Sequence, residues 1–235
     1  MKGLYQSNVM EKKNMKILAV DSSAKSASVA ILDNEKVLGE FYLNIGFTHS
    51  QTLVPMIKDL LDTAKIAVDD IDLFAVSNGP GSFTGLRIGA SVIKGLAFKN
   101  NTPCVAVSTL ESIAYNLINS DCIASAVMDA RCGQVYNADF EIKNGQMKRL
   151  SPDRTITIDN LHGELGHYDK KIIFVGDGAD LCYNVNDLKE NIFIADNNFR
   201  FQTAKNVAAI ARLKFLSDEW LAPSSLVPNY LRPII

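Results

Sequence analysis

The feature that most constrains this sequence is a junction in which an apolar strand runs into a glycine-rich turn and then directly into a helix. The strand covers residues 73–77, the turn residues 79–81, and the helix residues 84–99. Glycine supplies positive φ angles and proline a fixed φ, which together turn a chain away from a sheet. Ser82 or Thr84 can cap the helix by accepting a hydrogen bond from a free backbone N–H. The junction therefore predicts a strand, a tight turn and a helix of an α/β protein.

The same junction is a potential anion site, because free N–H groups and the positive end of the helix dipole converge at a helix N-terminus. The known phosphate-loop patterns do not fit it. A Walker loop needs a lysine after its second glycine, and a dinucleotide fingerprint needs a glycine where Thr84 stands. Arg87 keeps a phosphate role open, but a structural corner is the favoured interpretation, because glycine turns mostly serve backbone geometry.

The composition is that of a globular chain without a strong charge. The 235 residues suffice for one large domain or two small lobes, and 47% of them are hydrophobic. The 24 basic and 26 acidic residues leave a net charge of −2, whereas a protein that binds RNA alone carries a marked basic surface. If RNA is involved, we expect another chain to hold it.

Cysteine usage and hydropathy indicate a reducing compartment. The four cysteines form no C-x-x-C pair, so we expect reduced core thiols rather than a disulfide framework or a zinc site. No stretch reaches the ~18 uninterrupted apolar residues of a membrane span, and no signal peptide precedes the first strand. We therefore expect a cytoplasmic protein. The cysteines are Cys104, Cys122, Cys132 and Cys182.

Residues 1–14 are polar and lack apolar periodicity. Met15, directly before the first apolar strand, can serve as a second start. We expect residues 1–14 to be a disordered and dispensable leader, because termini without packing residues usually fray.

Strands and helices alternate along the chain, which predicts the α/β class. The first lobe is expected to hold strands at residues 16–21, 27–32, 37–43, 73–77 and 104–107, with helices at 48–65 and 84–99. The second is expected to hold strands at residues 123–128, 134–142 and 171–175, with helices at 108–119 and 202–220. A strand ending in aspartate and a strand running into a glycine turn occur once in each half, which favours two related lobes.

The domain boundary is expected between the two sets of elements. We assign residues 15–107 to the first lobe and residues 108–235 to the second, with the last helix and tail packing back. Residues 144–170 are polar and rich in turns, so the second lobe is predicted to be the smaller, reduced one.

The helix at residues 84–99 carries apolar residues on two faces, more than the ~100° stripe of a surface helix. Small residues keep parts of it thin, so a matching helix pair from a partner could complete a four-helix bundle. We expect a bulky charge at Ala90 or Ser91 to break association while leaving the monomer folded. The candidate interface residues are Leu53, Met56, Leu60, Arg87, Ala90, Ser91 and Lys94.

Several motifs carry a family resemblance. They are Asn78-Gly79-Pro80-Gly81-Ser82-Phe83-Thr84-Gly85-Leu86-Arg87, Asp21-Ser22-Ser23, His49-Ser50-Gln51, Ser108-Thr109-Leu110, Asp129-Ala130-Arg131 and Tyr230-Leu231-Arg232. In this order they resemble the TsaB family, and the resemblance covers almost the whole chain. The first motif is highly specific, whereas the others support it by position.

The resemblance implies an actin-like (ribonuclease-H-like) fold of two lobes and a non-catalytic role in making threonylcarbamoyladenosine in tRNA. It implies a catalytic paralogue, TsaD, as partner, a separate ATPase, TsaE, and self-association through the first-lobe helices when the chain is alone. By the same resemblance tRNA is met only through the complex. We expect no cofactor bound tightly by this chain alone, with ATP possible at the partner interface.

An enzyme of the same fold is the alternative: a small-molecule kinase or ATPase using Asp21, Asp129 and the turn at Gly79 and Gly81. The sequence weakens it, because residues 21–26 contain no glycine to bring backbone amides close to a phosphate. The two aspartates are read as turn formers or ion-pair partners. A vestigial nucleotide site would comprise Asp21, Ser22, Gly79, Gly81, Asp129, Gly176 and Gly178.

No metal site is expected. His49, His162 and His167 do not form a pair on one helix face, which is the usual signal for a zinc site.

Overall fold

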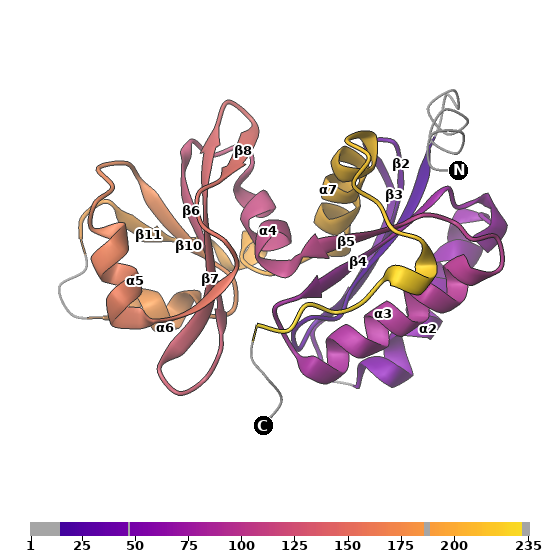
Figure 1. Cartoon of the computed structure of the whole chain (residues 1–235), viewed down its shortest axis with the longest axis horizontal. Helices are drawn as coiled ribbons and strands as arrows, with labels where there is room; N and C mark the ends of the chain where they lie inside the picture. Colours follow the sequence, from indigo (N-terminus) through magenta and orange to yellow (C-terminus); the bar gives the residue numbers. More distant parts are fainter. Residues whose placement is uncertain (1–14, 47, 186–188, 232–235) are drawn as a thin grey trace. The chain divides into compact units, whose positions relative to one another are not determined.

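The structure, a computed structural model, describes residues 15–46, 48–185 and 189–231. The chain divides into two compact units (Figure 1). The first takes the chain up to Val107 together with Thr203–Asn229, and the second takes Ser108–Gln202 together with the chain from Tyr230. The first crossing between units falls where the sequence analysis placed the domain boundary. The expected leader at residues 1–14 lies outside the described residues.

Unit 1 is built on a five-stranded sheet in the order β3-β2-β1-β4-β5. Strands β1 to β3 are antiparallel neighbours, and β4 runs parallel to β1. The strands are β1 (Lys16–Asp21), β2 (Ala27–Asp33), β3 (Lys36–Leu43), β4 (Leu73–Gly79) and β5 (Cys104–Ser108).

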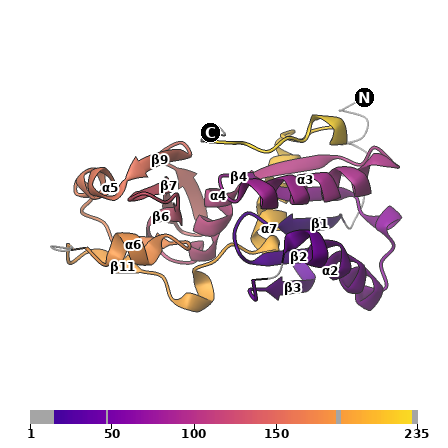
Figure 2. The same ribbon diagram turned by 90° about the horizontal axis from the view of Figure 1, so that it is seen from below.

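Helices cover both faces of this sheet. Helices α2 (His49–Ala64) and α3 (Phe83–Phe98) lie on one side and α7 (Ala204–Leu216) on the other (Figure 1). The inner strands β1 and β2 are therefore buried on both faces, which explains why they are almost continuously apolar. Two short 3-10 helices complete the unit: η1 (Val68–Asp70), and η4 (Pro223–Ser225), which lies along α3 (Figure 2).

The position of α7 corrects the sequence analysis, which counted this helix with the second lobe. It packs on β1, β2 and β4 of unit 1. The reason is that its apolar side chains, among them Val207, Ala211 and Phe215, fill the face that α2 and α3 leave open. The segment that follows also stays with unit 1, because Leu221 exchanges two backbone hydrogen bonds with Cys104.

Unit 2 is built on a six-stranded sheet in the order β11-β10-β6-β7-β8, with β9 also pairing with β7. Helix α4 packs on β6 and β7, while α5 packs on β9 and α6 on β10 and β11. The strands are β6 (Cys122–Asp129), β7 (Gln134–Lys143), β8 (Gln146–Arg149), β9 (Arg154–Thr157), β10 (Ile172–Val175) and β11 (Ile192–Ile194). The helices are α4 (Thr109–Ala114), η2 (Tyr115–Leu117), α5 (Ile158–Leu165), α6 (Ala179–Tyr183) and η3 (Asn197–Phe199).

The two sheets share one topology. Reading β6, β7, β8, β10 and β11 as strands one to five gives the order 3-2-1-4-5, which is also the order in unit 1. In both, strands one to three are antiparallel and strand four runs parallel to strand one. This doubled topology is the actin-like fold, as predicted. The second copy is reduced: β8 has 4 residues where β3 has 8, and α5 has 8 where α2 has 16.

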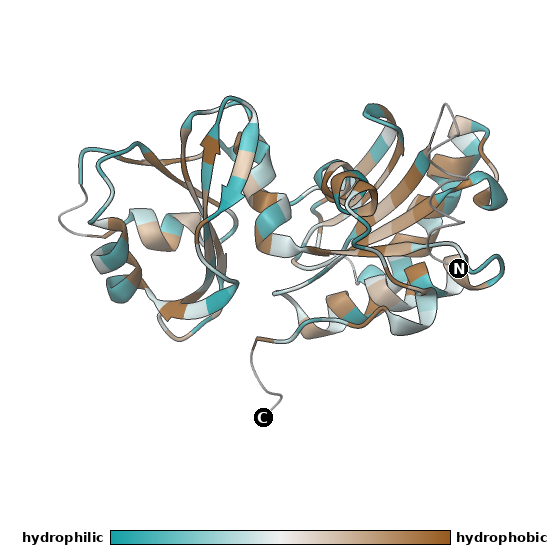
Figure 3. Ribbon diagram, turned by 45° about the horizontal axis from the view of Figure 1, so that its top comes forward, coloured by the Kyte–Doolittle hydropathy of each residue, from teal (hydrophilic) through white to brown (hydrophobic). Residues whose placement is uncertain are grey.

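Hydrophobic residues follow the strands and the sheet-facing sides of the helices in each unit (Figure 3). Along α2 the buried side chains recur every three or four residues, as expected for one apolar stripe. Within the described ranges no helix has the length and apolar character needed to span a bilayer.

The burial of α2 yields a stability prediction. We expect Leu53→Ala to lower the free energy of unfolding by about 2–5 kcal/mol, because Leu53 is fully buried and its truncation leaves a cavity. Its neighbour Val54 is 54% exposed, so Val54→Ala should change stability by less than about 0.5 kcal/mol. Urea unfolding of both variants measures the difference; equal values would place Leu53 on the surface.

Candidate functional site

The end of β1 holds a buried, hydrogen-bonded carboxylate. Asp21 is 1% exposed, and its Oδ1 accepts hydrogen bonds from the backbone N–H of Ser23 at 2.9 Å and the Ser23 hydroxyl at 2.7 Å. The hydroxyl of Ser77, on β4, donates to the other oxygen. Burial raises the pKa of Asp21 above its ordinary value, and the hydrogen bonds from Ser77 and Ser23 offset only part of this. Asp21 is thus enclosed by its own neighbours.

The loop after β1 is held against the start of α3 by backbone contacts. The N–H of Ser82 donates to the carbonyl oxygen of Ser23 at 2.6 Å, and the Ser22 hydroxyl donates to the carbonyl oxygen of Gly85 at 2.9 Å. A Cβ at Gly81 would overlap the Ser23 carbonyl, and one at Gly85 would overlap the Ser22 carbonyl. These two glycines therefore allow two backbone segments to touch.

The α3 N-terminus is organised as the sequence predicted. Ser82 is the N-cap, and its hydroxyl accepts from the N–H of Gly85 at 3.3 Å. Gly79 and Gly81 have φ angles of +127° and +154°, which glycine alone adopts readily. The tail of unit 1 closes the turn, since the N–H of Asn229 donates to the carbonyl oxygen of Asn78 at 2.6 Å.

His49 anchors the start of α2 to the same loop. Its Nε2 lies 2.6 Å from the carbonyl oxygen of Ala24, so Nε2 carries the proton and donates it. A Cβ added to Gly85 would lie 3.1 Å from Cδ2 of the His49 ring, so this ring packs against the start of α3. His49 therefore joins α2, α3 and the loop after β1, a role that sequence reasoning missed.

Unit 2 repeats this plan in part. The side chain of Asp129, at the end of β6, is exposed and accepts from the N–H of Arg131 at 2.7 Å, which makes it a turn former. Gly176 has a φ of +117°, and a Cβ there would overlap the carbonyl oxygen of Val127. A Cβ on Gly178 would lie 2.9 Å from the backbone of Met128. The predicted nucleotide residues thus fall into two groups, Asp21, Ser22, Gly79 and Gly81 in unit 1 and Asp129, Gly176 and Gly178 in unit 2.

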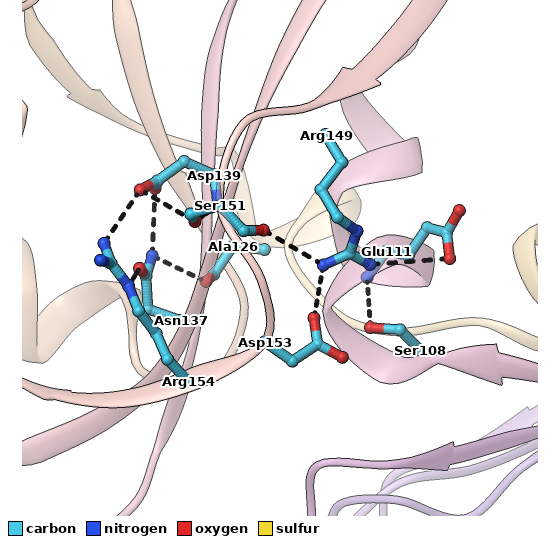
Figure 4. A network of polar contacts seen from close by, with 9 residues as sticks. All are labelled: Ser108, Glu111, Ala126, Asn137, Asp139, Arg149, Ser151, Asp153 and Arg154. Atoms are coloured by element: carbon cyan, nitrogen blue, oxygen red, sulfur yellow. Dashed lines mark hydrogen bonds and ion pairs between the residues drawn. The ribbon is translucent and has the colours of Figure 1, made fainter. Parts of the chain in front are cut away.

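A polar network inside unit 2 was not predicted (Figure 4). Asn137 and Asp139 are buried on β7, and the Asn137 amide donates to Asp139 at 3.0 Å and to Ser125 at 3.1 Å. The Arg154 guanidinium, on β9, donates to Asn137 at 3.0 Å and forms ion pairs with Asp139 and Glu164. The arginine balances the buried carboxylate and links β7, β9 and α5, which is a structural role.

The candidate interface residues fall into three classes. Leu53, Met56, Leu60 and Ala90 are at most 5% exposed and face the core of unit 1, which corrects their selection as surface residues. A bulky charge at Ala90 would accordingly disrupt the monomer. The side chains of Arg87 and Ser91 are exposed, and Arg87 stacks over the Phe83 ring at 3.7 Å. Lys94 is half-buried and donates to the carbonyl oxygen of Ser224 at 3.4 Å.

All four cysteines are free thiols. Burial raises the pKa of Cys104 and of Cys182 to about 12 and that of Cys122 to about 11, so these three are unreactive core residues. Cys132 is exposed, contrary to the expectation of a core position, because it lies in the turn after β6. Across residues 15–46, 48–185 and 189–231, no three His, Cys, Asp or Glu side chains form a group that could hold a metal ion.

Comparison with known proteins places this geometry in a family. A family model described as TsaD, tRNA N6-adenosine threonylcarbamoyltransferase, matches residues 46–232. The tRNA threonylcarbamoyladenosine biosynthesis protein TsaB of Bacillus subtilis is 32% identical over 220 residues, which are 93% of this chain and 94% of that protein. This chain belongs to the TsaB family.

Further TsaB relatives extend the match. TsaB of Escherichia coli is 29% identical over 221 residues, which are 93% of this chain and 95% of that protein. The solved structure of YeaZ from Pseudomonas aeruginosa superposes with a TM-score of 0.81 at 26% identity, covering 92% of this chain and all of that one. Proteins of the TsaB family take their name from the biosynthesis of threonylcarbamoyladenosine in tRNA.

The glycine contacts lead to a paired prediction within α3. We expect Gly85→Ala to lower the free energy of unfolding by about 1–3 kcal/mol, because the added methyl group overlaps the Ser22 carbonyl. Gly95→Ala should raise it by about 0.5–1 kcal/mol, because no heavy atom lies within 4 Å of the new Cβ and alanine favours a helix. Urea unfolding distinguishes the two, and a similar change in both would contradict the backbone contact.

The raised pKa of Asp21 predicts a dependence of stability on pH. In the unfolded state Asp21 loses its proton near the ordinary pKa of 3.8, whereas in the native state its pKa is raised and the proton is kept to higher pH. Between these two pKa values the native state binds more protons than the unfolded state, so the contribution of Asp21 to stability falls as the pH rises. Asp21→Asn removes this titration, so its stability relative to the natural chain should improve as the pH rises.

Urea unfolding between about pH 4 and pH 7 tests this. The difference in the free energy of unfolding between Asp21→Asn and the natural chain should change with pH. If the free energies of unfolding of Asp21→Asn and of the natural chain differ by the same amount at every pH, the pKa of Asp21 is not raised in the native state.

Proposed function

We propose that this chain is a non-catalytic subunit of the complex that makes threonylcarbamoyladenosine in tRNA, where it pairs with and supports a TsaD-like catalytic paralogue. Its membership of the TsaB family supports the pathway. The match of the TsaD family model to residues 46–232 supports a paralogous relation to the catalytic subunit.

The observation that carries the non-catalytic role is the closed contact between the loop after β1 and the start of α3. An actin-like ATPase needs backbone N–H groups of this loop to face a phosphate. Here the N–H of Ser23 donates a hydrogen bond to the Asp21 carboxylate, and the carbonyl oxygen of Ser23 accepts one from the N–H of Ser82. Gly81 and Gly85 approach so closely that even a methyl group does not fit between the two segments.

The exposed side of α2 and α3 is the surface that we assign to the partner. Arg87 and Ser91 lie one helical turn apart on α3, and Val54 on α2 is an exposed apolar residue. Two helices with such a surface suit a four-helix bundle with a similar pair from a paralogue, or from a second copy of this chain when it is alone. A TsaE-like ATPase would join this pair, and ATP would bind at the partner interface. The tRNA would be bound only by the assembled complex.

We expect Arg87→Glu and Ser91→Arg to weaken capture of a TsaD-like partner by at least about tenfold, because each buries an unpaired charge in a close helix contact. Both side chains are exposed in the monomer, so the melting temperature of Ser91→Arg should stay unchanged. That of Arg87→Glu should fall only slightly, because the variant loses the stacking on the Phe83 ring. Pull-down and gel filtration with the purified partner measure the effect.

Matched controls lie on unit 2. Lys143→Glu repeats the charge reversal and Asn119→Arg repeats the added guanidinium at exposed positions. Both controls should capture the partner like the natural chain. Full capture by Arg87→Glu and Ser91→Arg would move the interface away from α3.

A nucleotide titration distinguishes the non-catalytic subunit from the alternative, a kinase or ATPase. We expect the isolated chain to bind ATP weakly and to hydrolyse none, because the loop that would receive the phosphates is closed on α3. Calorimetry and a phosphate-release assay measure both quantities. Micromolar affinity together with turnover that Asp21→Asn abolishes would favour the enzyme.

A further inference from the structure

Residues 223–229, the C-terminal segment of unit 1, begin with η4 and lie along α3 (Figure 2). The Lys94 ammonium, on α3, donates a hydrogen bond to the carbonyl oxygen of Ser224 at 3.4 Å. On its other side α3 packs against α2. The three elements therefore lie side by side, with α3 between α2 and the C-terminal segment (Figure 2).

The C-terminal segment is held in place on both sides of Val227. Leu226 is buried and belongs to the hydrophobic core of unit 1. The N–H of Asn229 donates to the carbonyl oxygen of Asn78 at 2.6 Å, and a Cβ on Gly79 would lie 2.3 Å from the carbonyl oxygen of Asn229. Val227 itself is 62% exposed. A β-branched side chain on a fixed backbone has few conformations to lose, so Val227 can enter an interface at a low cost in entropy.

Large apolar side chains are exposed on all three elements. Phe98 on α3 is 77% exposed and Val227 62%, the two highest values for large hydrophobic side chains in the described part of the chain. Val54 on α2 is exposed as well. Phe98 lies two helical turns after Ser91, on the side of α3 that we assign to the partner. Apolar side chains that gather on one surface mark an interaction site, whereas isolated ones are ordinary.

We propose that the C-terminal segment is a third element of the surface that binds the paralogous partner, and that Val227 packs on an apolar side chain of this partner. The contact rests on the proposed function, because the occupant is the same partner. Packed helices lie about 8–10 Å apart, so a partner helix over α3 also meets the element beside α3. Residues 221–231 contain no charged side chain, so the contact that the segment offers is apolar.

Three variants test the contact by titration of the purified TsaD-like partner into the full chain. Val227→Asp should weaken binding at least about fivefold, because it places an unpaired charge in an apolar contact. Val227→Ile keeps a β-branched apolar side chain and should bind within about threefold of the natural chain. Val37→Asp makes the same exchange at an exposed position of β3, which two strands separate from β4, and should bind within about twofold.

The outcomes separate this contact from the proposed function. If Arg87→Glu loses the partner while Val227→Asp binds it fully, the segment is no part of the surface and only this proposal is overturned. Equal losses for Val227→Asp and Val37→Asp would show a general effect of the added charge and also overturn it. Weaker self-association of Val227→Asp with full binding of the partner would assign the segment to a second copy of this chain instead. A natural chain that does not bind the partner would overturn the proposed function and this contact together.

Hydrogen exchange on the natural chain tests the contact without any substitution. We expect the amides of residues 223–229 to exchange at least about tenfold more slowly in the saturated complex than in the free chain, because the partner covers them. The amides of residues 36–39 in β3 should exchange at the same rate in both. Unchanged exchange of residues 223–229 would overturn the proposal even where Val227→Asp binds weakly, since that variant could then act only through α3.

Discussion

The backbone contact between the loop after β1 and the first turn of α3 is the interaction on which unit 1 depends. It joins the end of β1, the central strand of the sheet, to α3, and it is made where glycine leaves no side chain between the segments. The Asp21 carboxylate is bonded within this contact, and His49 ties α2 to it. Main-chain atoms make its closest approaches, so a methyl group at Gly85 would overlap the Ser22 carbonyl, and the Ser22 hydroxyl adds a hydrogen bond to the Gly85 carbonyl oxygen.

Unit 2 repeats the contact with different chemistry. A Cβ on Gly176 would lie 2.0 Å from the carbonyl oxygen of Val127 in β6, and one on Gly81 of unit 1 would lie 2.3 Å from the carbonyl oxygen of Ser23 just after β1. The strand-end aspartate differs, since Asp129 is exposed and bonded to its own turn, whereas Asp21 is buried. The short helices of unit 2 cover less of their sheet, and the bonded set of Arg154, Asn137 and Asp139 adds polar links between its strands. The two units therefore share a topology and differ in what stabilises it.

Local signals made most elements predictable. The glycine turn, the Ser82 cap and the strand ends follow from residues that lie next to one another. The order of elements indicated the α/β class and two related lobes, and the resemblance to the TsaB family indicated the actin-like fold. The residues that face a partner were harder to predict. Leu53, Met56 and Leu60 belong to one apolar stripe, and a stripe indicates which side of a helix is buried without saying what covers it; in the structure the sheet does. The position of α7 and the bonds of Arg154 depend on contacts between distant residues, which periodicity does not report.

The return of residues 203–229 to unit 1 has a consequence for synthesis on the ribosome. Unit 2 is continuous from Ser108 to Gln202, so all of its sheet is available before α7 has been made. Unit 1 begins first and is completed last, since Ile17, Ala30 and Leu32 have no helix to cover them until α7 emerges. The nascent chain therefore carries an open apolar sheet while nearly one hundred further residues are added, a period in which chaperones that bind apolar surface can act on it. Unit 1 is thus the first unit to be synthesised and the last to be completed.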